Sequence, residues 1–215
     1  MAKSVAQKPK RIPANPRAAL AALRKADRKL AAAMDKVGPF AIGAKPAGIE
    51  AFCRSIIGQQ LSVAVAGKIH DRFMTCTNCG EEDLTADHIL ALRDEDLRAV
   101  GLSNAKVGSV KSLAKFWHDQ GLSAEKLEHM PDDEIIALMT QVKGIGPWTV
   151  KMILMFCLRR ADILPVEDLG LKMGLKKIYK LEELPKPKEI EAMAEKWRPW
   201  RSIGTWYCWR ILAVK

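Results

Sequence analysis

Residues 142–151 read VKGIGPWTVK and lie between two apolar runs with the three-and-four spacing of helices. Gly144 and Gly146 stand inside this stretch, and glycine permits the positive φ values and close backbone approach that a tight interhelical turn needs. Pro147 suits the first position of the next helix, where a missing amide donor costs nothing. The stretch therefore predicts two helices joined by a glycine hairpin over residues 140–158.

A hairpin of this kind leaves backbone amides pointing outward at the start of a helix, which is a favourable site for a phosphate. Cationic side chains flank it. We expect phosphate contacts from a short set of residues: Lys143, Gly144, Gly146, Thr149 and Lys151. The alternative is an ordinary helix–helix turn, which a single Gly-x-Gly pattern would favour.

The chain is strongly basic, with a net charge of +10 from 35 Lys and Arg against 25 Asp and Glu and a pI near 9.5. This balance favours a polyanionic partner, because binding releases counterions. The sequence shows neither an apolar run long enough to span a bilayer nor a signal-peptide pattern. We expect a monomer with no membrane partner, located in the cytoplasm or nucleoid of a prokaryote or the nucleus of a eukaryote.

The five cysteines fit a reducing compartment, because an odd number argues against a disulfide framework. Cys76 and Cys79 form the pattern CTNC and, with His70 and His88, offer four possible zinc ligands. No second C-x-x-C exists, so we favour a helix end with two partly exposed thiols. The other three are expected as buried thiols in apolar helical surroundings: Cys53, Cys157 and Cys208.

Helical periodicity dominates the chain and alternating strand patterns are nearly absent, so we expect an all-α fold. Residues 1–15 are basic, lack acids and predict a flexible tail before a domain over 16–215. Asp94 is a plausible N-cap and Gly101 a plausible helix stop. Helices are expected over 16–36, 47–59 and 62–75, in shorter pieces over 86–120, and from 131 into the hairpin. After the acid at 168 we expect a helix to about 179, and then two more helices after the linker LPKPK.

Four motifs, in this order, resemble the helix-hairpin-helix DNA glycosylases with a Gly/Pro-rich loop and a catalytic aspartate, most closely the 3-methyladenine DNA glycosylase II branch. They are IIGQQLSVAVAGKI at 56–69, VKGIGPWTVK at 142–151, PVEDLG at 165–170 and AEKWRPWRSIGTWYCWRIL at 194–212. The resemblance implies two helical lobes, one formed by the N- and C-terminal helices, without the N-terminal β domain of some members. It implies a monofunctional enzyme that flips and excises alkylated bases, of the 3-methyladenine and 7-methylguanine type, from double-stranded DNA.

Asp168 matches the catalytic aspartate of this family, while Glu167 is its neighbour. Cleavage of an N-glycosidic bond builds positive charge on the sugar, and a nearby carboxylate stabilises it and can activate water. Asp168 would also suit the N-cap of a helix beginning at Leu169, and both roles are compatible. Members that cut the backbone carry a lysine where Trp148 stands, so we expect no lyase step.

The resemblance places Trp148 and Trp209 in the base pocket, and Trp206 and Tyr207 lie next to the second of these. An electron-rich indole attracts a cationic alkylated purine that has left the stack. Other tryptophans are expected to pack the last helix: Trp197 and Trp200.

Gln59 and Gln60 match the family's wedge, which fills the duplex after base flipping; the alternative is a simple helix end. The family also implies an alkali ion, Na⁺ or K⁺, at the hairpin. Its ligands would be backbone carbonyls of Gln141, Lys143 (or Val142) and Ile145 (or Gly146). No four-cysteine run is present for an iron–sulfur cluster, and we expect no required cofactor.

Two other functions stay open from sequence. One is a glycosylase for deaminated or oxidised bases. The other is a non-catalytic helix-hairpin-helix DNA-binding protein, in which Asp168 only caps a helix. A backbone binder needs neither an acid after the hairpin nor tryptophans suited to a base pocket, so their joint presence favours the enzyme.

Overall fold

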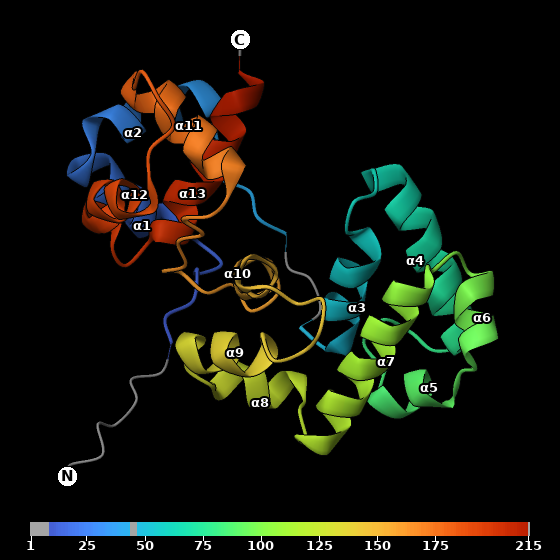
Figure 1. Cartoon of the computed structure of the whole chain (residues 1–215). Helices are drawn as coiled ribbons and strands as arrows, with labels where there is room; N and C mark the ends of the chain where they lie inside the picture. Colours follow the sequence, from blue (N-terminus) through green and yellow to red (C-terminus); the bar gives the residue numbers. More distant parts are fainter. Residues whose placement is uncertain (1–8, 44–46, 215) are drawn as a thin grey trace. The chain divides into compact units, whose positions relative to one another are not determined.

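The computed structural model describes residues 9–43 and 47–214, and in these ranges the protein is built of helices without a β-sheet, as predicted (Figure 1). The described residues form two compact units. The first contains Pro9 and residues 47–153, and the second contains residues 10–43 and 154–214. Among the described helices, none is both long and apolar enough to cross a bilayer.

The helices of the first unit are α3 (Ile49–Gly58), α4 (Val63–Thr77), α5 (Ala86–Ala91), α6 (Asp94–Ala99), α7 (Asn104–Asp119), α8 (Ala124–His129) and α9 (Asp132–Met139). Helix α10 (Pro147–Phe156) begins in the first unit and ends in the second. The second unit contains α1 (Arg17–Ala26), α2 (Arg28–Val37), α11 (Leu169–Tyr179), α12 (Pro187–Ala194), η1 (Glu195–Trp197), α13 (Arg201–Arg210) and η2 (Ile211–Ala213).

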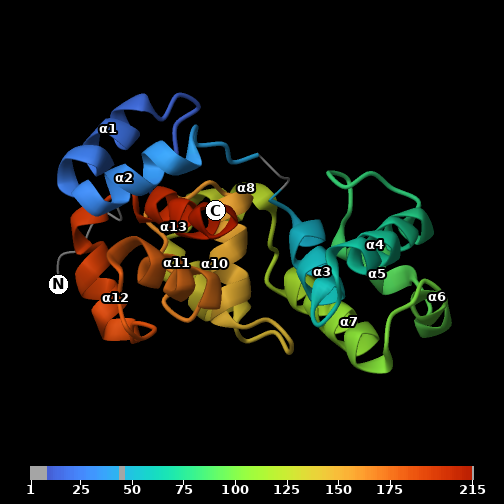
Figure 2. The same ribbon diagram turned by 90° about the horizontal axis from the view of Figure 1, so that it is seen from above.

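The long helix α7 is the central support of the first unit, where it packs against α3, α5 and α6 (Figure 2). Its buried face includes Val110, Leu113 and Trp117, and the Trp117 ring lies 5.7 Å from the ring of Phe52 in α3. The N-terminus of α7 is capped by Ser103, whose hydroxyl accepts from a backbone amide of the first turn. The helix is therefore fixed along one face and at its start.

The expected helix signals before α7 are partly right. Gly101 has a φ of +108° and follows the end of α6, as predicted. Asp94, however, is the first residue of α6, and the N-cap position belongs to Arg93, which makes no side-chain cap bond. Asp94 instead joins two other acids in the first turn, where negative charge favours the helix dipole.

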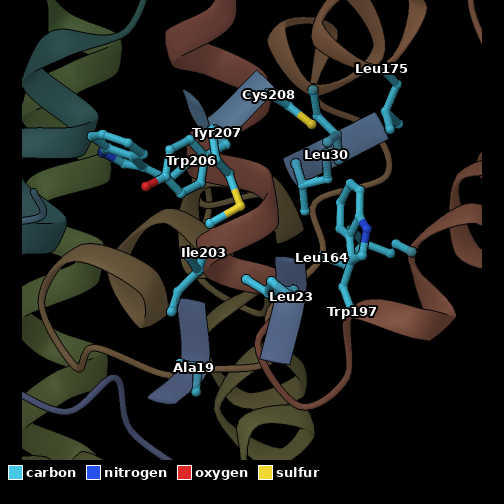
Figure 3. Packing of buried hydrophobic residues seen from close by; sticks show 14 of the residues in the cluster. Ala19, Leu23, Leu30, Leu164, Leu175, Trp197, Ile203, Trp206, Tyr207 and Cys208 are labelled. Carbon is cyan, nitrogen blue, oxygen red and sulfur yellow. The ribbon is translucent and has the colours of Figure 1, made fainter. Parts of the chain in front are cut away.

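The core of the second unit is formed where α13 packs against α2 and α11 (Figure 3). A Cβ on Gly174 of α11 would lie 2.1 Å from the Cys208 carbonyl oxygen, so only glycine allows this close helix contact. Trp197 is fully buried in this core, and Trp200 packs against it while half-buried, in agreement with the predicted packing role.

The single helix expected over residues 16–36 is wrong, because the chain breaks at Asp27. Asp27 has extended backbone angles and caps α2, with its Oδ1 accepting from the amides of Lys29 and Leu30 at 3.0 Å. Its Oδ2 accepts from the Trp197 indole N–H at 2.8 Å and from the Tyr179 hydroxyl. These partners are distant in sequence, so local periodicity gave no sign of the break.

The predicted flexible tail is too long. Within it, the Ile12 amide donates to the Arg159 carbonyl at 2.7 Å, and the Ala161 amide donates to the Lys10 carbonyl at 2.9 Å. Ile12 is also buried in the core of the second unit. The described segment from residue 10 is therefore part of the fold, while residues 1–8 lie outside the described residues.

The candidate metal ligands are not gathered at the CTNC motif. His70 lies 2.6 Å from the buried Glu50, and His88 caps α5 through the Thr85 amide. The Cys79 thiol donates to the Thr77 hydroxyl, and both thiols of the motif are partly exposed. Burial raises the pKa of the thiols of Cys53 and Cys208, whereas Cys157 is only partly buried, contrary to expectation.

Candidate active site and nucleic-acid interface

Asp168 is the N-cap of α11, and its carboxylate is also held by a tryptophan. Oδ1 accepts from the Leu171 amide at 2.6 Å and from the indole N–H of Trp209 at 2.7 Å. The cap fixes the carboxylate relative to α11, and the indole adds a second, rigid donor from α13. The expected capping role is therefore present, and it leaves the carboxylate in one defined orientation.

Gly170 permits the contact between Asp168 and Trp209. A Cβ at this position would lie 2.8 Å from Cδ1 of Trp209 and 3.1 Å from Oδ1 of Asp168. Real Cβ atoms do not approach a ring carbon so closely, so a larger residue must displace the indole. Sequence reasoning missed this role, although the glycine stands two positions after the acid in PVEDLG.

Phe156 is a second residue that sequence reasoning missed. Its ring stacks on Trp209, with ring centroids 5.8 Å apart and planes inclined by 18°. The two aromatic rings and the Asp168 carboxylate all belong to the second unit. They form one cluster, in which Trp209 contacts the acid through its N–H and the phenyl ring through its face.

Trp206 and Tyr207 lie elsewhere, in the core of the second unit (Figure 3). They are 8% and 2% exposed, Trp206 packs edge-on against Phe40, and the Tyr207 hydroxyl donates to the Gly38 carbonyl. A side chain buried in this way has no face to offer a base. The structure thus corrects their assignment to the base pocket, because nearly every side of α13 is buried.

The hairpin loop, residues 140–146, joins α9 to α10. Gly144 has a φ of +89°, the Ile145 amide donates to the Val142 carbonyl at 3.0 Å, and Pro147 is the first residue of α10. This is the predicted helix–hairpin–helix. Only the first of the two glycines has a positive φ, so Gly146 is not required for that reason.

The residues that were expected to bind a phosphate differ in their exposure to solvent. Lys143, Gly144 and Gly146 are exposed, and Lys151 is half-buried. Thr149 is 5% exposed because it lies on the buried face of α10, so the structure removes it from the accessible set. Trp148, the neighbouring residue, is 44% exposed.

The loop between α3 and α4, residues 59–62, contains the two glutamines expected as a wedge; we call it the wedge loop. Gln59 and Gln60 are both exposed, but they differ in their contacts. The Gln59 side chain donates to the Gly144 carbonyl at 2.7 Å. Gln60 has a φ of +60°, and its side chain makes no hydrogen bond to another described residue.

Comparison with known families identifies the fold. The sequence profile of the HhH-GPD superfamily of base excision DNA repair proteins matches residues 53–199. DNA-3-methyladenine glycosylase 1 of Schizosaccharomyces pombe is 34% identical over 163 residues, which are 75% of this chain and 71% of the relative. An alkylbase DNA glycosidase-like protein of the same yeast is 31% identical over 190 residues, which are 86% of this chain and 88% of the relative.

Solved structures agree. The S. pombe 3-methyladenine DNA glycosylase in complex with abasic DNA superposes with a TM-score of 0.75 at 30% identity, covering 89% of this chain and 95% of that one. A DNA-3-methyladenine glycosidase from Bacillus halodurans gives a TM-score of 0.79 at 26% identity, covering 94% and 91%. The chain therefore belongs to the helix-hairpin-helix superfamily of base excision DNA repair proteins.

Proposed function

We propose that this protein is a monofunctional DNA glycosylase that removes alkylated bases, of the 3-methyladenine and 7-methylguanine type, from double-stranded DNA. Family membership and the names of the relatives support this function. The observation that carries it is the Asp168 carboxylate, which an indole N–H holds at 2.7 Å beside a stacked aromatic pair.

Asp168 would act on the deoxyribose. As the glycosidic bond breaks, the carboxylate stabilises the positive charge on the sugar and orients or deprotonates the attacking water. Its two Oδ1 contacts fix the carboxylate before substrate arrives, so little reorganisation is needed during the reaction. Alkylated purines are good leaving groups because they are already cationic, and a site with one carboxylate suits them.

Aromatic faces would hold the flipped base. In the second unit, Trp209 stacks on Phe156 and offers an electron-rich indole. Trp148 is half-exposed and is a separate candidate for contact with a base. Stacking holds a base of any kind, and the attraction of a cation to an indole face favours a positively charged one. This preference supports alkylated purines over neutral oxidised bases.

The wedge is assigned to Gln60. Gln59 uses its side-chain amide to bind the Gly144 carbonyl, whereas Gln60 is exposed and held in the left-handed region, away from that contact. A polar wedge at this position can hydrogen-bond the base left without a partner.

The hairpin loop would bind a phosphate through Lys143, the exposed glycines and Lys151. Within the part of the chain that the structure describes, the carbonyls of Gln141, Lys143 and Ile145 accept no hydrogen bond, whereas the Val142 carbonyl is used by the Ile145 amide. Alternate carbonyls without donors are suitable ligands for an alkali ion, which would add positive charge beside the phosphate.

Trapping with borohydride tests the monofunctional assignment. Trp148 has no amine with which to form a Schiff base, and we expect no covalent adduct between the protein and methylated duplex DNA after reduction. An adduct formed by the wild type would show that a lysine attacks the sugar and would contradict the assignment.

A second candidate is a non-catalytic DNA-binding protein, in which Asp168 serves only as the N-cap of α11. A substrate panel separates the possibilities. Release of free base only from methylated duplex supports the proposal, while release only from deaminated or oxidised duplex replaces the substrate class. Tight binding to abasic duplex without release from any substrate would favour the binding protein.

Replacement of Gly170 by Ala should reduce base release without unfolding the protein. The new Cβ displaces the Trp209 indole from Asp168, and a misplacement of about 1 Å at a reacting group can lower a rate by about 100-fold. Single-turnover release from methylated duplex measures the effect. Gly67→Ala is the matched control, since its Cβ enters open space on α4, and equal rates for both variants would contradict the role given to Gly170.

A further inference from the structure

Lys106 lies in the first turn of α7 and binds the end of another helix. Its Nζ donates to the carbonyl of Ile57 at 2.7 Å and to that of Gln59 at 2.9 Å. These carbonyls lie at the C-terminal end of α3, where a helix has no backbone donors for them and where a cation also favours the helix dipole. Lys106 therefore fixes the point at which α3 ends and the wedge loop begins.

Gln59 continues this connection to the hairpin loop. Its backbone carbonyl is held by Lys106, and its side chain donates to the Gly144 carbonyl across 85 residues of sequence. One residue thus contacts both the lysine and the hairpin loop. Any shift of the C-terminal end of α3 therefore moves the Gln59 side-chain donor away from the Gly144 carbonyl.

Helix α7 also packs against the hairpin loop. Ser109 lies about one turn after Lys106 in α7, and its Oγ is 2.9 Å from the place where a Cβ on Gly144 would stand. The Ser109 hydroxyl donates to the Ala105 carbonyl at 3.0 Å, which holds it in place. Helix α7 therefore contacts both loops, and all of these contacts lie within the first unit.

The contacts hold a conformation that is unfavourable by itself. Gln60, next to the anchored carbonyl, has a φ of +60°, which residues with a Cβ rarely adopt unless their surroundings fix it. Burial lowers the pKa of Lys106, because the ammonium group is partly withdrawn from water where it meets these carbonyls. The Lys106 ammonium group therefore binds backbone carbonyls of the protein itself.

We propose that Lys106 is a positioning residue that, through Gln59, locks the wedge loop to the hairpin loop, so that both meet the duplex as one rigid surface. The inference rests on the proposed function, in which the wedge loop enters the DNA and the hairpin loop binds a phosphate. A rigid pair places the wedge at a fixed distance from the bound phosphate and reduces the cost of ordering it during base flipping.

Lys111 provides a matched control on the same helix. Its Nζ also binds helix-end carbonyls, those of Ile89, Leu90 and Leu92 at the end of α5. Lys106→Met and Lys111→Met remove the same kind of bond and keep a similar apolar stem. We expect similar decreases in Tm, but a decrease of about 10- to 100-fold in single-turnover base release only for Lys106→Met.

DNA binding separates positioning from a direct phosphate contact. For Lys106→Met we expect wild-type affinity for undamaged duplex with an unchanged salt slope, and weaker affinity for abasic duplex. Loss of affinity for undamaged duplex with a salt slope reduced by about 1 would overturn the proposal, because it marks a lost phosphate contact. Equal release rates for the two lysine variants would also overturn it.

Amide hydrogen exchange of the free protein tests the connection between the wedge loop and the hairpin loop without any measurement of activity. The probes are backbone amides whose acceptors lie in the two loops or beside them: Gln59, Leu61 and Ile145. We expect faster exchange at all three in Lys106→Met and in Gln59→Leu, and no change in Lys111→Met. Faster exchange confined to the wedge loop would contradict the coupling, whereas absence of base release by the wild type would contradict only the proposed function.

Discussion

Asp168→Asn is expected to fold and bind DNA but to lose base excision by at least about 100- to 1,000-fold. Asn keeps an oxygen that can accept from the Leu171 amide and from the Trp209 indole, so the cap and the local packing survive. It removes the negative charge that stabilises the sugar cation and activates water. Single-turnover release of methylpurine from duplex DNA measures the loss.

The neighbouring acid is the control for this variant. Glu167 is exposed and precedes the cap, so Glu167→Gln should retain excision within about twofold. Affinity of each variant for abasic duplex is measured in parallel. Wild-type excision by Asp168→Asn, or an equal loss in Glu167→Gln, would contradict the assignment of Asp168 as the catalytic carboxylate.

The largest effect on stability is expected for Asp27→Asn. Asn retains the cap through its oxygen, but its NH₂ group then faces the Trp197 N–H and the Tyr179 hydroxyl in the core. Leaving buried donors without an acceptor costs about 3 kcal/mol in total, which lowers the Tm of a chain of this size by about 6–12 °C. Thermal unfolding followed by circular dichroism measures the change.

Acid should remove the same stabilisation in the wild type. Burial by itself raises the pKa of Asp27, but the hydrogen bonds from Tyr179, Trp197, the Leu30 amide and Lys196 together outweigh it, so the folded pKa is lower than the usual 3.8. A lowered pKa stabilises the fold above pH 3.8, and this contribution is lost as the pH falls through the folded value.

The exposed Asp35 supplies the comparison for both experiments. It pairs with Arg24 while 66% exposed, so Asp35→Asn should change the free energy of unfolding by less than about 1 kcal/mol. The wild type should lose more stability than Asp27→Asn as the pH falls from 3.8 through the folded pKa of Asp27. Equal acid sensitivity of the two proteins would show that Asp27 does not carry this dependence.

Local residue chemistry was enough to predict much of the fold. Gly144 and Pro147 predicted the hairpin because their backbone preferences act within one turn, and Asp168 was expected at an N-cap for the same reason. The prediction of helix bounds was wrong at Asp27, because the break there depends on hydrogen bonds from Tyr179 and Trp197, which are far away in the sequence.

The candidate site shows the same limit. Phe156 and Gly170 gain their roles only from contact with Trp209, which no spacing in the sequence predicts. Trp206 and Tyr207 could not be separated from Trp209 by pattern, because α13 is buried on almost every side and its sequence has no clear apolar face that would say which ring enters the core.

Release of free base by the wild-type protein tests the central claim most directly. The protein is incubated with methylated duplex DNA, free bases are separated by chromatography, and the DNA is examined for strand breaks before and after alkali. We predict free methylpurine together with breaks that appear only after alkali. Absence of free base from methylated duplex, under conditions in which the protein binds that DNA, would contradict the account.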